Sequence, residues 1–327
     1  MFFRSLIHAG LGLALVHPLP AQEHAQPWAD PSPHEARFVF ADDGTRLEFL
    51  DWGGSGELVL LLAGGGSSAH YFDSFAPRLT DEFRVVALTR RGHGASEDAA
   101  FDLGTLAGDI RALLDHLEIQ QAHLIGVSWA GEELTRFAGS YPDRVLSLVY
   151  VDAALDRTAN ADARLLQRAP RPPRSGADME SIGSLATWIE RYGGYSLPRP
   201  ELRASYILSE DGAVLGPRIT AETRRMLDAA EERPRYIEVQ ARALAIYAMQ
   251  DALVDAFPWV LADPAAMAEA LRFPVRSYTD ARYAEVEQFR SEVVRGRVVI
   301  MDAPHHVILA RAMESETVIR AFLLNEP

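Results

Sequence analysis

A serine stands where a predicted strand meets a predicted helix. Ser128 lies in the segment Gly-Val-Ser-Trp-Ala-Gly, residues 126–131, between an apolar run and a helical pattern. Small residues on both sides allow a sharp turn that exposes the serine oxygen. The helix N-terminus that follows offers unpaired N–H groups and a partial positive charge where an oxyanion would form. The segment therefore predicts a nucleophilic serine.

A serine nucleophile needs a base, and the base needs an acid that orients it. The candidates for the base are His305 and His306, which follow the last apolar run of the chain. The candidates for the acid are Asp251 and Asp152, and each of them follows an apolar run. Both aspartates fit the chain order serine, aspartate, histidine. The residues alone leave both choices open.

Two missing residue types narrow the possible chemistry. All 32 basic residues are arginine, and the chain has no cysteine. This composition excludes a P-loop lysine, Schiff-base chemistry, thiol nucleophiles, iron–sulfur clusters and disulfides. The net charge of -14 argues against nucleic-acid partners. No local cluster of histidines and carboxylates has metal-ligand spacing, so we expect neither a metal nor a cofactor.

The pattern of the chain predicts an α/β layered sheet. Short apolar runs typical of buried strands alternate with helical patterns, after an opening pair joined by the hairpin signal Asp42-Asp43-Gly44. The predicted strands are 37–41, 46–52, 58–62, 83–88, 122–127, 146–151, 243–248 and 297–301, and the predicted helices are 101–117, 128–141 and 317–324.

One interval breaks this alternation. Residues 153–242 contain no convincing buried strand but carry helical patches at 160–167, 179–192 and 221–232. A piece of this size between two strands indicates a helical insertion that could cover one end of the sheet. Its aromatic residues are assigned mostly to the small core of that insertion; they are Trp188, Tyr192, Tyr195, Tyr206 and Tyr236.

The chain resembles the α/β-hydrolase superfamily over nearly all of residues 36–325. Four landmarks follow in the family's order: a glycine run at 64–66 after the third strand, the Arg-Gly-His-Gly-Ala-Ser turn at 91–96, the Ser128 turn, and a late histidine. The resemblance implies a mostly parallel twisted sheet flanked by helices, with a helical cap inserted after the sixth strand. The core would comprise residues 36–152 and 243–327, and the cap residues 153–242.

The resemblance also implies roles for individual residues. It places His305, rather than His306, in the position of the catalytic base. It favours Asp251, after the seventh strand, as the acid, with Asp152, after the sixth, as the alternative that some members use. The backbone N–H groups of Gly65 and Trp129 would form the oxyanion hole.

A serine nucleophile with a histidine base favours acyl transfer to water. We expect a cofactor-free hydrolase that cleaves an ester, or a related acyl bond, of a small and largely apolar substrate beneath the cap. The alternatives are an aminopeptidase or amidase, a carbon–carbon hydrolase, or a non-hydrolytic ligand-binding protein of the same fold. Epoxide hydrolases and haloalkane dehalogenases place a carboxylate where this chain has Ser128, which argues against both.

The N-terminus has the pattern of an export signal. A basic start is followed by an apolar stretch at 6–16 and a small residue, Ala21, at a plausible cleavage site. We therefore expect a signal peptide over residues 1–21 and a flexible tail over 22–35. The apolar stretch is too short for a stable membrane anchor. The protein would be periplasmic or secreted if the leader is cleaved, and cytoplasmic otherwise; its oligomeric state stays open.

Overall fold

The computed structural model describes residues 28–158, 172, 174–250, 258–262, 264–272 and 275–325. The chain divides into two compact units, Met1–Pro31 and Ser32–Pro327. In the first unit only residues 28–31 are described, and they form no helix or strand. The predicted leader, the predicted helix at 160–167 and Asp251 lie outside the described residues.

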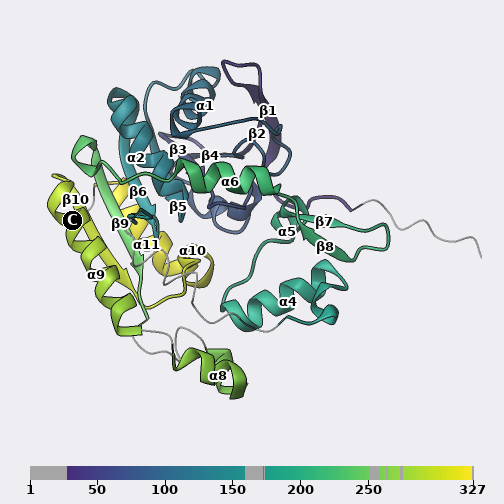
Figure 1. Ribbon diagram of the computed structural model, residues 1–327. Coiled ribbons are helices and arrows are strands. Elements are labelled where there is room, and N and C mark those ends of the chain that lie inside the picture. Colours follow the sequence, from purple (N-terminus) through teal and green to yellow (C-terminus); the bar gives the residue numbers. More distant parts are fainter. Residues whose placement is uncertain are drawn as a thin grey trace, which may run out of the picture. The chain divides into compact units, whose positions relative to one another are not determined.

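The second unit is built on an eight-stranded sheet with the strand order β1-β2-β4-β3-β5-β6-β9-β10 (Figure 1). The pairs β1–β2 and β2–β4 are antiparallel, and all other neighbouring strands are parallel. This sheet confirms the predicted fold class. The strands are β1 (Glu35–Phe40), β2 (Arg46–Gly53), β3 (Leu58–Leu62), β4 (Arg84–Leu88), β5 (Ala122–Val127), β6 (Val145–Val151), β9 (Arg242–Ala248) and β10 (Gly296–Met301).

The central strands are buried on both faces, as their continuous apolar runs predicted. Every residue of β3 and β5 is buried. Because parallel strands point the same way, the C-terminal ends of β3, β5 and β6 meet at one edge of the sheet. The turns that follow these strands carry the glycine run, Ser128 and Asp152.

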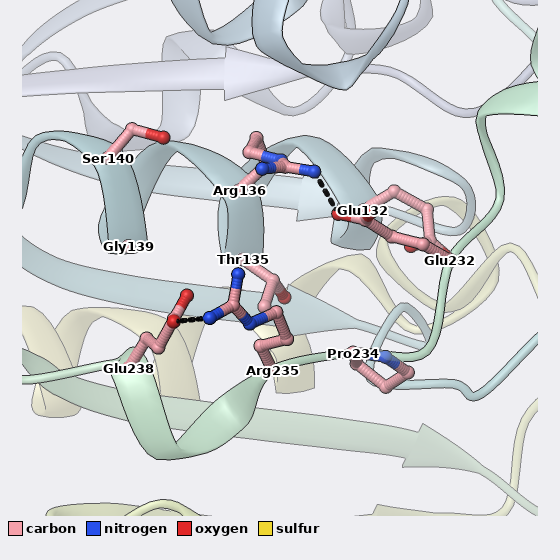
Figure 2. Close-up of a pocket in the computed structure, with 9 residues that line it drawn as sticks. All are labelled: Glu132, Thr135, Arg136, Gly139, Ser140, Glu232, Pro234, Arg235 and Glu238. Atoms are coloured by element: carbon pink, nitrogen blue, oxygen red, sulfur yellow. Dashed lines mark hydrogen bonds and ion pairs between the residues drawn. The ribbon is translucent and has the colours of Figure 1, made fainter.

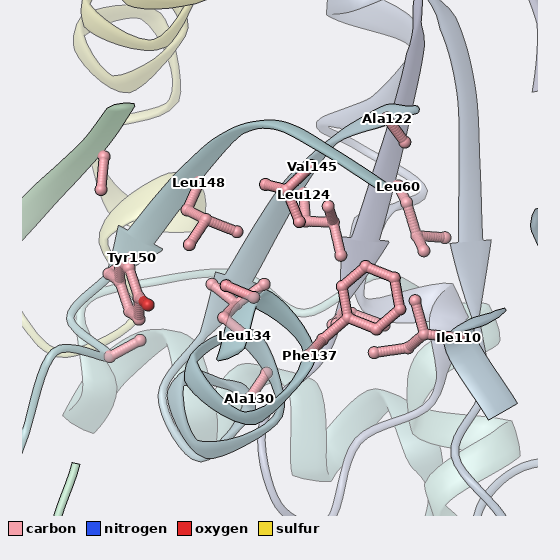
Figure 3. Packing of buried hydrophobic residues seen from close by; sticks show 14 of the residues in the cluster. Leu60, Ile110, Ala122, Leu124, Ala130, Leu134, Phe137, Val145, Leu148 and Tyr150 are labelled. Atoms are coloured by element: carbon pink, nitrogen blue, oxygen red, sulfur yellow. The ribbon is translucent and has the colours of Figure 1, made fainter. Parts of the chain in front are cut away.

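Helices and turns pack on the sheet through two apolar clusters. One cluster joins the sheet to α1 (Leu103–His116), α2 (Ala130–Ser140) and α9 (Val275–Glu292); Figure 3 shows Phe137 and Leu134 of α2 packed against Leu124 and Leu148 of the sheet. The other cluster includes residues of η1 (Ala69–Phe72), η2 (Ala76–Leu79), α10 (Val307–Ala310) and α11 (Ala312–Leu323). Outside the segment between β6 and β9, the remaining short elements are η3 (Pro142–Arg144), η6 (Pro258–Ala262) and α8 (Pro264–Ala270). Within the part of the chain described, no helix has both the length and the apolar character needed to cross a bilayer.

The segment between β6 and β9 is more than a set of helices. It contains η4 (Gly176–Met179), α4 (Ile182–Gly193), α5 (Arg199–Ser205), α6 (Ala221–Ala230) and η5 (Tyr236–Glu238), and also an antiparallel hairpin of β7 (Tyr206–Leu208) and β8 (Val214–Pro217). This hairpin was not predicted, because its strands have only three and four residues and lack a buried apolar run. Three of the aromatic residues assigned to the core of the insertion, Trp188, Tyr195 and Tyr206, pack against the small apolar cluster around Leu185. Tyr236 packs in the main core instead.

Candidate active site

The turn between β5 and α2 holds Ser128 in a conformation that few residues adopt. Its φ of 54° lies in the left-handed region, which costs free energy for a residue with a side chain. The Ser128 amide donates a hydrogen bond to the carbonyl of Val151 at the end of β6. A Cβ at Gly131 would lie 1.9 Å from the carbonyl oxygen of Ala153, so only glycine fits there. The turn is therefore fixed by its contacts with the end of β6.

His305 lies within hydrogen-bond distance of Ser128, as the sequence analysis predicted for the base. Its Nε2 atom is 2.8 Å from Ser128 Oγ, and 43% of its side chain is exposed. His306 lies away from the serine: its Nδ1 atom is 3.0 Å from the Tyr71 hydroxyl, and its ring lies 4.1 Å, centre to centre, from that of Tyr195. Burial lowers the pKa of His306 to about 3, so its imidazole stays neutral. These contacts favour His305 over His306 as the base.

Asp152 occupies the position that the acid needs. Its Oδ2 atom lies 2.5 Å from His305 Nδ1, and its Oδ1 atom accepts hydrogen bonds from the amide of Ala248 and from the guanidinium of Arg282. Asp251, which the sequence analysis favoured, lies outside the described residues. The contact with His305 therefore supports Asp152, the alternative of the two aspartates, as the candidate acid.

The charge of Asp152 is stabilised by its neighbours although the side chain is buried. Burial by itself would raise the pKa of this carboxyl, but Arg282 and His305 lower it to about 2. Arg282 comes from α9; its side chain is 5% exposed, and its guanidinium also donates to Glu285. A permanently charged arginine thus keeps Asp152 ionised beneath the histidine.

The glycine run after β3 approaches the serine turn closely. A Cβ at Gly64 would lie 3.2 Å from Ser128 Cβ, and one at Gly65 would lie 3.2 Å from Trp129 Cβ. Neither the Gly65 amide nor the Trp129 amide donates to a backbone carbonyl within the described part of the chain. The two amides predicted for the oxyanion hole therefore belong to two segments of the chain that approach each other beside Ser128.

The side chain of Trp129 packs rather than faces a substrate. It is 5% exposed and lies in an apolar cluster with Leu103, Leu106 and Leu227. The guanidinium of Arg90 lies 4.8 Å from the centre of its ring. The Trp129 side chain therefore packs between α1 and the insertion after β6.

A buried arginine and a buried glutamate hold the glycine run and the residues next to it. The guanidinium of Arg90 donates to the carbonyls of Ala63 and Gly64 and pairs with Glu133 of α2. Glu201 of α5 accepts hydrogen bonds from the amide and the hydroxyl of Ser68. The first contact joins the run to the helix behind Ser128, and the second joins it to the insertion after β6.

Arg282, Glu201 and Arg90 were not identified from the sequence as parts of this site. Arg282 and Glu201 lie in charged helical segments where many arginines and glutamates look alike, and only the fold turns these two inward. Arg90 precedes the Arg-Gly-His-Gly-Ala-Ser turn, so its position next to a recognised landmark could have drawn attention to it.

A polar pocket lies on the other side of α2 and is separate from this site. Figure 2 shows its lining, which alternates acidic and basic side chains such as Glu132, Arg136 and Arg235. Ser128 and His305 are not among the residues that line it. Two of its glutamates pair with its two arginines, as Arg136–Glu232 and Arg235–Glu238, and Glu132 takes part in neither pair.

Comparison with known proteins supports the α/β fold described above. Residues 57–260 match the family model described as the alpha/beta hydrolase fold. The acetyltransferase component of the acetoin cleaving system of Pseudomonas putida is 36% identical over 148 residues, which are 43% of this chain and 39% of that protein. A fluoroacetate dehalogenase from a Burkholderia species is 36% identical over 107 residues, 31% of this chain and 35% of that protein. The chain thus matches well under half of the length of these relatives.

Among solved structures, E-2-(acetamidomethylene)succinate hydrolase superposes with a TM-score of 0.64 at 22% sequence identity. The superposition covers 89% of this chain and 99% of that one. At this identity the likeness concerns the fold, and it extends over nearly the whole chain.

Proposed function

The chain belongs to the α/β-hydrolase fold family, and on that premise we propose that it is a serine hydrolase that cleaves an ester or related acyl bond through an acyl-enzyme. One observation carries the proposal: Ser128 Oγ, His305 and the Asp152 carboxylate follow one another at distances of 2.8 and 2.5 Å. The amides of Gly65 and Trp129 lie beside this line. A nucleophile, a base, an orienting acid and two oxyanion donors are the parts that acyl transfer needs.

The proposed reaction has two halves. Ser128 Oγ attacks the carbonyl carbon of the substrate while His305 Nε2 accepts the hydroxyl proton, and the amides of Gly65 and Trp129 bind the oxyanion. Collapse of this intermediate breaks the bond to the leaving group, which takes the proton from His305, and leaves an acyl group on Ser128. A water molecule then gives a proton to His305 and attacks the acyl carbon, and the Ser128 oxygen leaves with that proton.

Asp152 acts through His305 in this scheme. Its carboxylate accepts the Nδ1–H hydrogen bond, which fixes the ring orientation and leaves Nε2 as the proton acceptor. The exposure of His305, 43% of its side chain, gives water access to the acyl-enzyme.

The serine distinguishes this chain from part of its family. A fluoroacetate dehalogenase is among its relatives, but displacement of a halide through an alkyl-enzyme ester needs a carboxylate nucleophile. The residue at the turn is Ser128, whose hydroxyl is suited to attack a carbonyl carbon with the help of a base. We therefore favour acyl hydrolysis over dehalogenation as the reaction of this protein.

The surroundings of the glycine run support a small apolar acyl substrate. A Cβ at Gly65 would lie 3.5 Å from a methyl carbon of Leu227, and a Cβ at Gly66 would lie 3.6 Å from one of Ile219. Both side chains come from the insertion after β6, so apolar atoms of the insertion lie over the run that carries an oxyanion donor.

A fluorophosphonate probe tests the nucleophile. We expect stoichiometric covalent labelling of the full-length protein, and no labelling of Ser128→Ala, measured by intact mass. Ser140→Ala, a serine at the end of α2, is a matched control that keeps the labelling. A folded protein whose Ser128 does not react would contradict the proposal and favour a ligand-binding role.

An amide substrate is the second candidate because the fold matches that of E-2-(acetamidomethylene)succinate hydrolase over nearly the whole chain. A panel of p-nitrophenyl esters of increasing acyl length, with the matching anilides, separates the two classes. We expect kcat/KM to be highest for short acyl esters. Anilide hydrolysis at comparable kcat/KM would assign the protein to the amidases instead.

We also propose that the protein is exported and that its leader is removed after Ala21. N-terminal sequencing of the protein recovered from the periplasm or the medium of the expressing cell should begin at Gln22. Recovery of the uncleaved chain from the cytoplasm alone would contradict this proposal.

A further inference from the structure

A second cluster of chemically active side chains lies outside the proposed catalytic machinery. His34 precedes β1, His70 lies on η1, and Asp73 follows η1. The Nδ1 atom of His34 is 3.0 Å from Asp73 Oδ1, and the Nδ1 atom of His70 is 3.0 Å from Asp73 Oδ2. No metal was expected from the sequence, where no cluster of histidines and carboxylates stands out; the fold brings His34 close to His70 and Asp73.

The cluster is shielded from solvent. The exposed fractions of the side chains are 5% for His34, 14% for His70 and 4% for Asp73. The two imidazole rings lie 5.1 Å apart, centre to centre, and Trp52 covers His34 edge-on at 5.3 Å. Two imidazoles and a carboxylate are thus gathered in one enclosed place.

The carboxylate of Asp73 lies between the two imidazoles, with one oxygen next to the Nδ1 atom of each ring. Its Oδ1 atom is buried and lies 3.0 Å from His34 Nδ1. A small separation of these two atoms makes room for an ion that both of them bind.

We propose that His34, His70 and Asp73 form a binding site for a divalent transition-metal ion of the zinc class. Zinc is bound by histidine nitrogens and carboxylate oxygens at about 2.0–2.2 Å, which separates neighbouring ligand atoms by about 3.3–3.6 Å in a tetrahedral site. The ligand atoms of the three residues all lie within 4.8 Å of one another, so small side-chain movements reach that geometry. Two imidazoles and one carboxylate suit zinc or its transition-metal neighbours better than calcium or magnesium, which prefer oxygen ligands.

The position of the site indicates a structural role. η1 follows the glycine run, and its Tyr71 hydroxyl contacts His306, the neighbour of the proposed base. An ion held by His34, His70 and Asp73 ties the start of β1 to this turn. The unfolded chain has no assembled site. Because the ion would bind only the folded protein, it would raise the stability of the fold.

The test uses the full-length protein after treatment with a chelator, with zinc chloride as the probe. Isothermal titration should show one zinc ion per chain, and saturating zinc should raise Tm by several degrees. His70→Gln and Asp73→Asn should each weaken zinc binding at least tenfold and remove the rise in Tm. His116→Gln, which changes an exposed histidine at the end of α1, should change neither.

Trp52 supplies a local readout that global unfolding does not mimic. Zinc should change the fluorescence of the folded protein, and Trp52→Phe should remove most of that change while zinc still binds. Zinc binding that persists at full strength in the His70→Gln Asp73→Asn double variant would overturn the proposal. So would a chelator-treated protein that stays folded and takes up no zinc.

Discussion

Two buried carboxylates border the proposed active site, and their environments differ. Asp152 lies beneath His305 at the end of β6, where it contacts the cationic guanidinium of Arg282. Glu201 lies on the other side, on α5, where it accepts hydrogen bonds from the hydroxyls of Ser68 and Ser205 and from the Ser68 amide. Both side chains are nearly inaccessible, at 4% and 1% exposure.

The pKa values of the two carboxyls are shifted in opposite directions. Burial raises the pKa of Glu201 to about 7, because neutral donors offset only part of the cost of burying a charge. For Asp152 the charges of Arg282 and His305 outweigh burial and lower the pKa to about 2. The charge of the partner, rather than the degree of burial, therefore decides whether a carboxylate at this site is ionised at neutral pH.

The largest effect is expected when the ionised carboxylate is replaced. Asp152→Asn keeps the shape of the side chain, but the amide does not hold the His305 proton on Nδ1 as the carboxylate does. His305 Nε2 is then no longer available as the base, so kcat should fall by about 10³–10⁴-fold. The measurement is steady-state hydrolysis of the best ester of the panel, with folding checked by circular dichroism. Asp251→Asn is the comparison from the sequence analysis; a larger loss there than at Asp152 would reverse the assignment of the acid.

A smaller effect is expected when the cation beneath Asp152 is removed. Arg282→Met keeps the length of the side chain but leaves the carboxylate without its strongest stabilising charge, so the pKa of Asp152 should rise. The stability and orientation that ionised Asp152 provides are present above its unfolded pKa and are lost as pH falls through its folded pKa. We expect kcat to fall by about 10–100-fold and the acid limb of the pH–rate profile to move to higher pH.

The control for that prediction lies on the same helix. Arg290 of α9 is half exposed and pairs with Glu287 at the surface, so Arg290→Met should leave the profile in place. An unchanged kcat together with an unshifted acid limb in Arg282→Met would contradict the role given to this arginine.

The sequence predicted the parts of the fold and site that repeat a local pattern. Six of the eight strands have continuous apolar runs and the first two flank a hairpin signal; Ser128, Gly65 and His305 stand at landmarks next to such runs. The residues that contact the glycine run and Asp152, and so influence which carboxyls are ionised, could not be predicted in the same way. Arg282 and Glu201 contact residues more than 100 positions away, and nothing in their local sequence separates them from exposed arginines and glutamates.

The choice between Asp152 and Asp251 shows the same limit. Both aspartates follow buried strands, and the sequence does not tell which one the loop after β10 approaches. The decisive contact joins Asp152 to His305, 153 positions along the chain. This contact depends on the packing of the parallel strands, which places the ends of β6 and β9 side by side. The local sequence does not contain that information.

The smallest effect on activity is expected at Glu201, where the change appears in the pH dependence of stability. The pKa of Glu201 is about 7 in the fold and about 4.3 in an unfolded chain, so the contribution of this group is complete below the unfolded pKa and is lost as pH rises through 7. Glu201→Gln stays neutral and keeps an oxygen acceptor for Ser68, while the Ser205 hydroxyl can turn to accept from the new amide. The free energy of unfolding of the variant relative to the unmodified protein should therefore increase between pH 4.5 and 7, by about 1–3 kcal/mol, with kcat changed by less than about fivefold. Urea unfolding at several pH values measures this difference. A difference that does not vary with pH would mean that Glu201 is ionised throughout, and the contrast with Asp152 would then disappear.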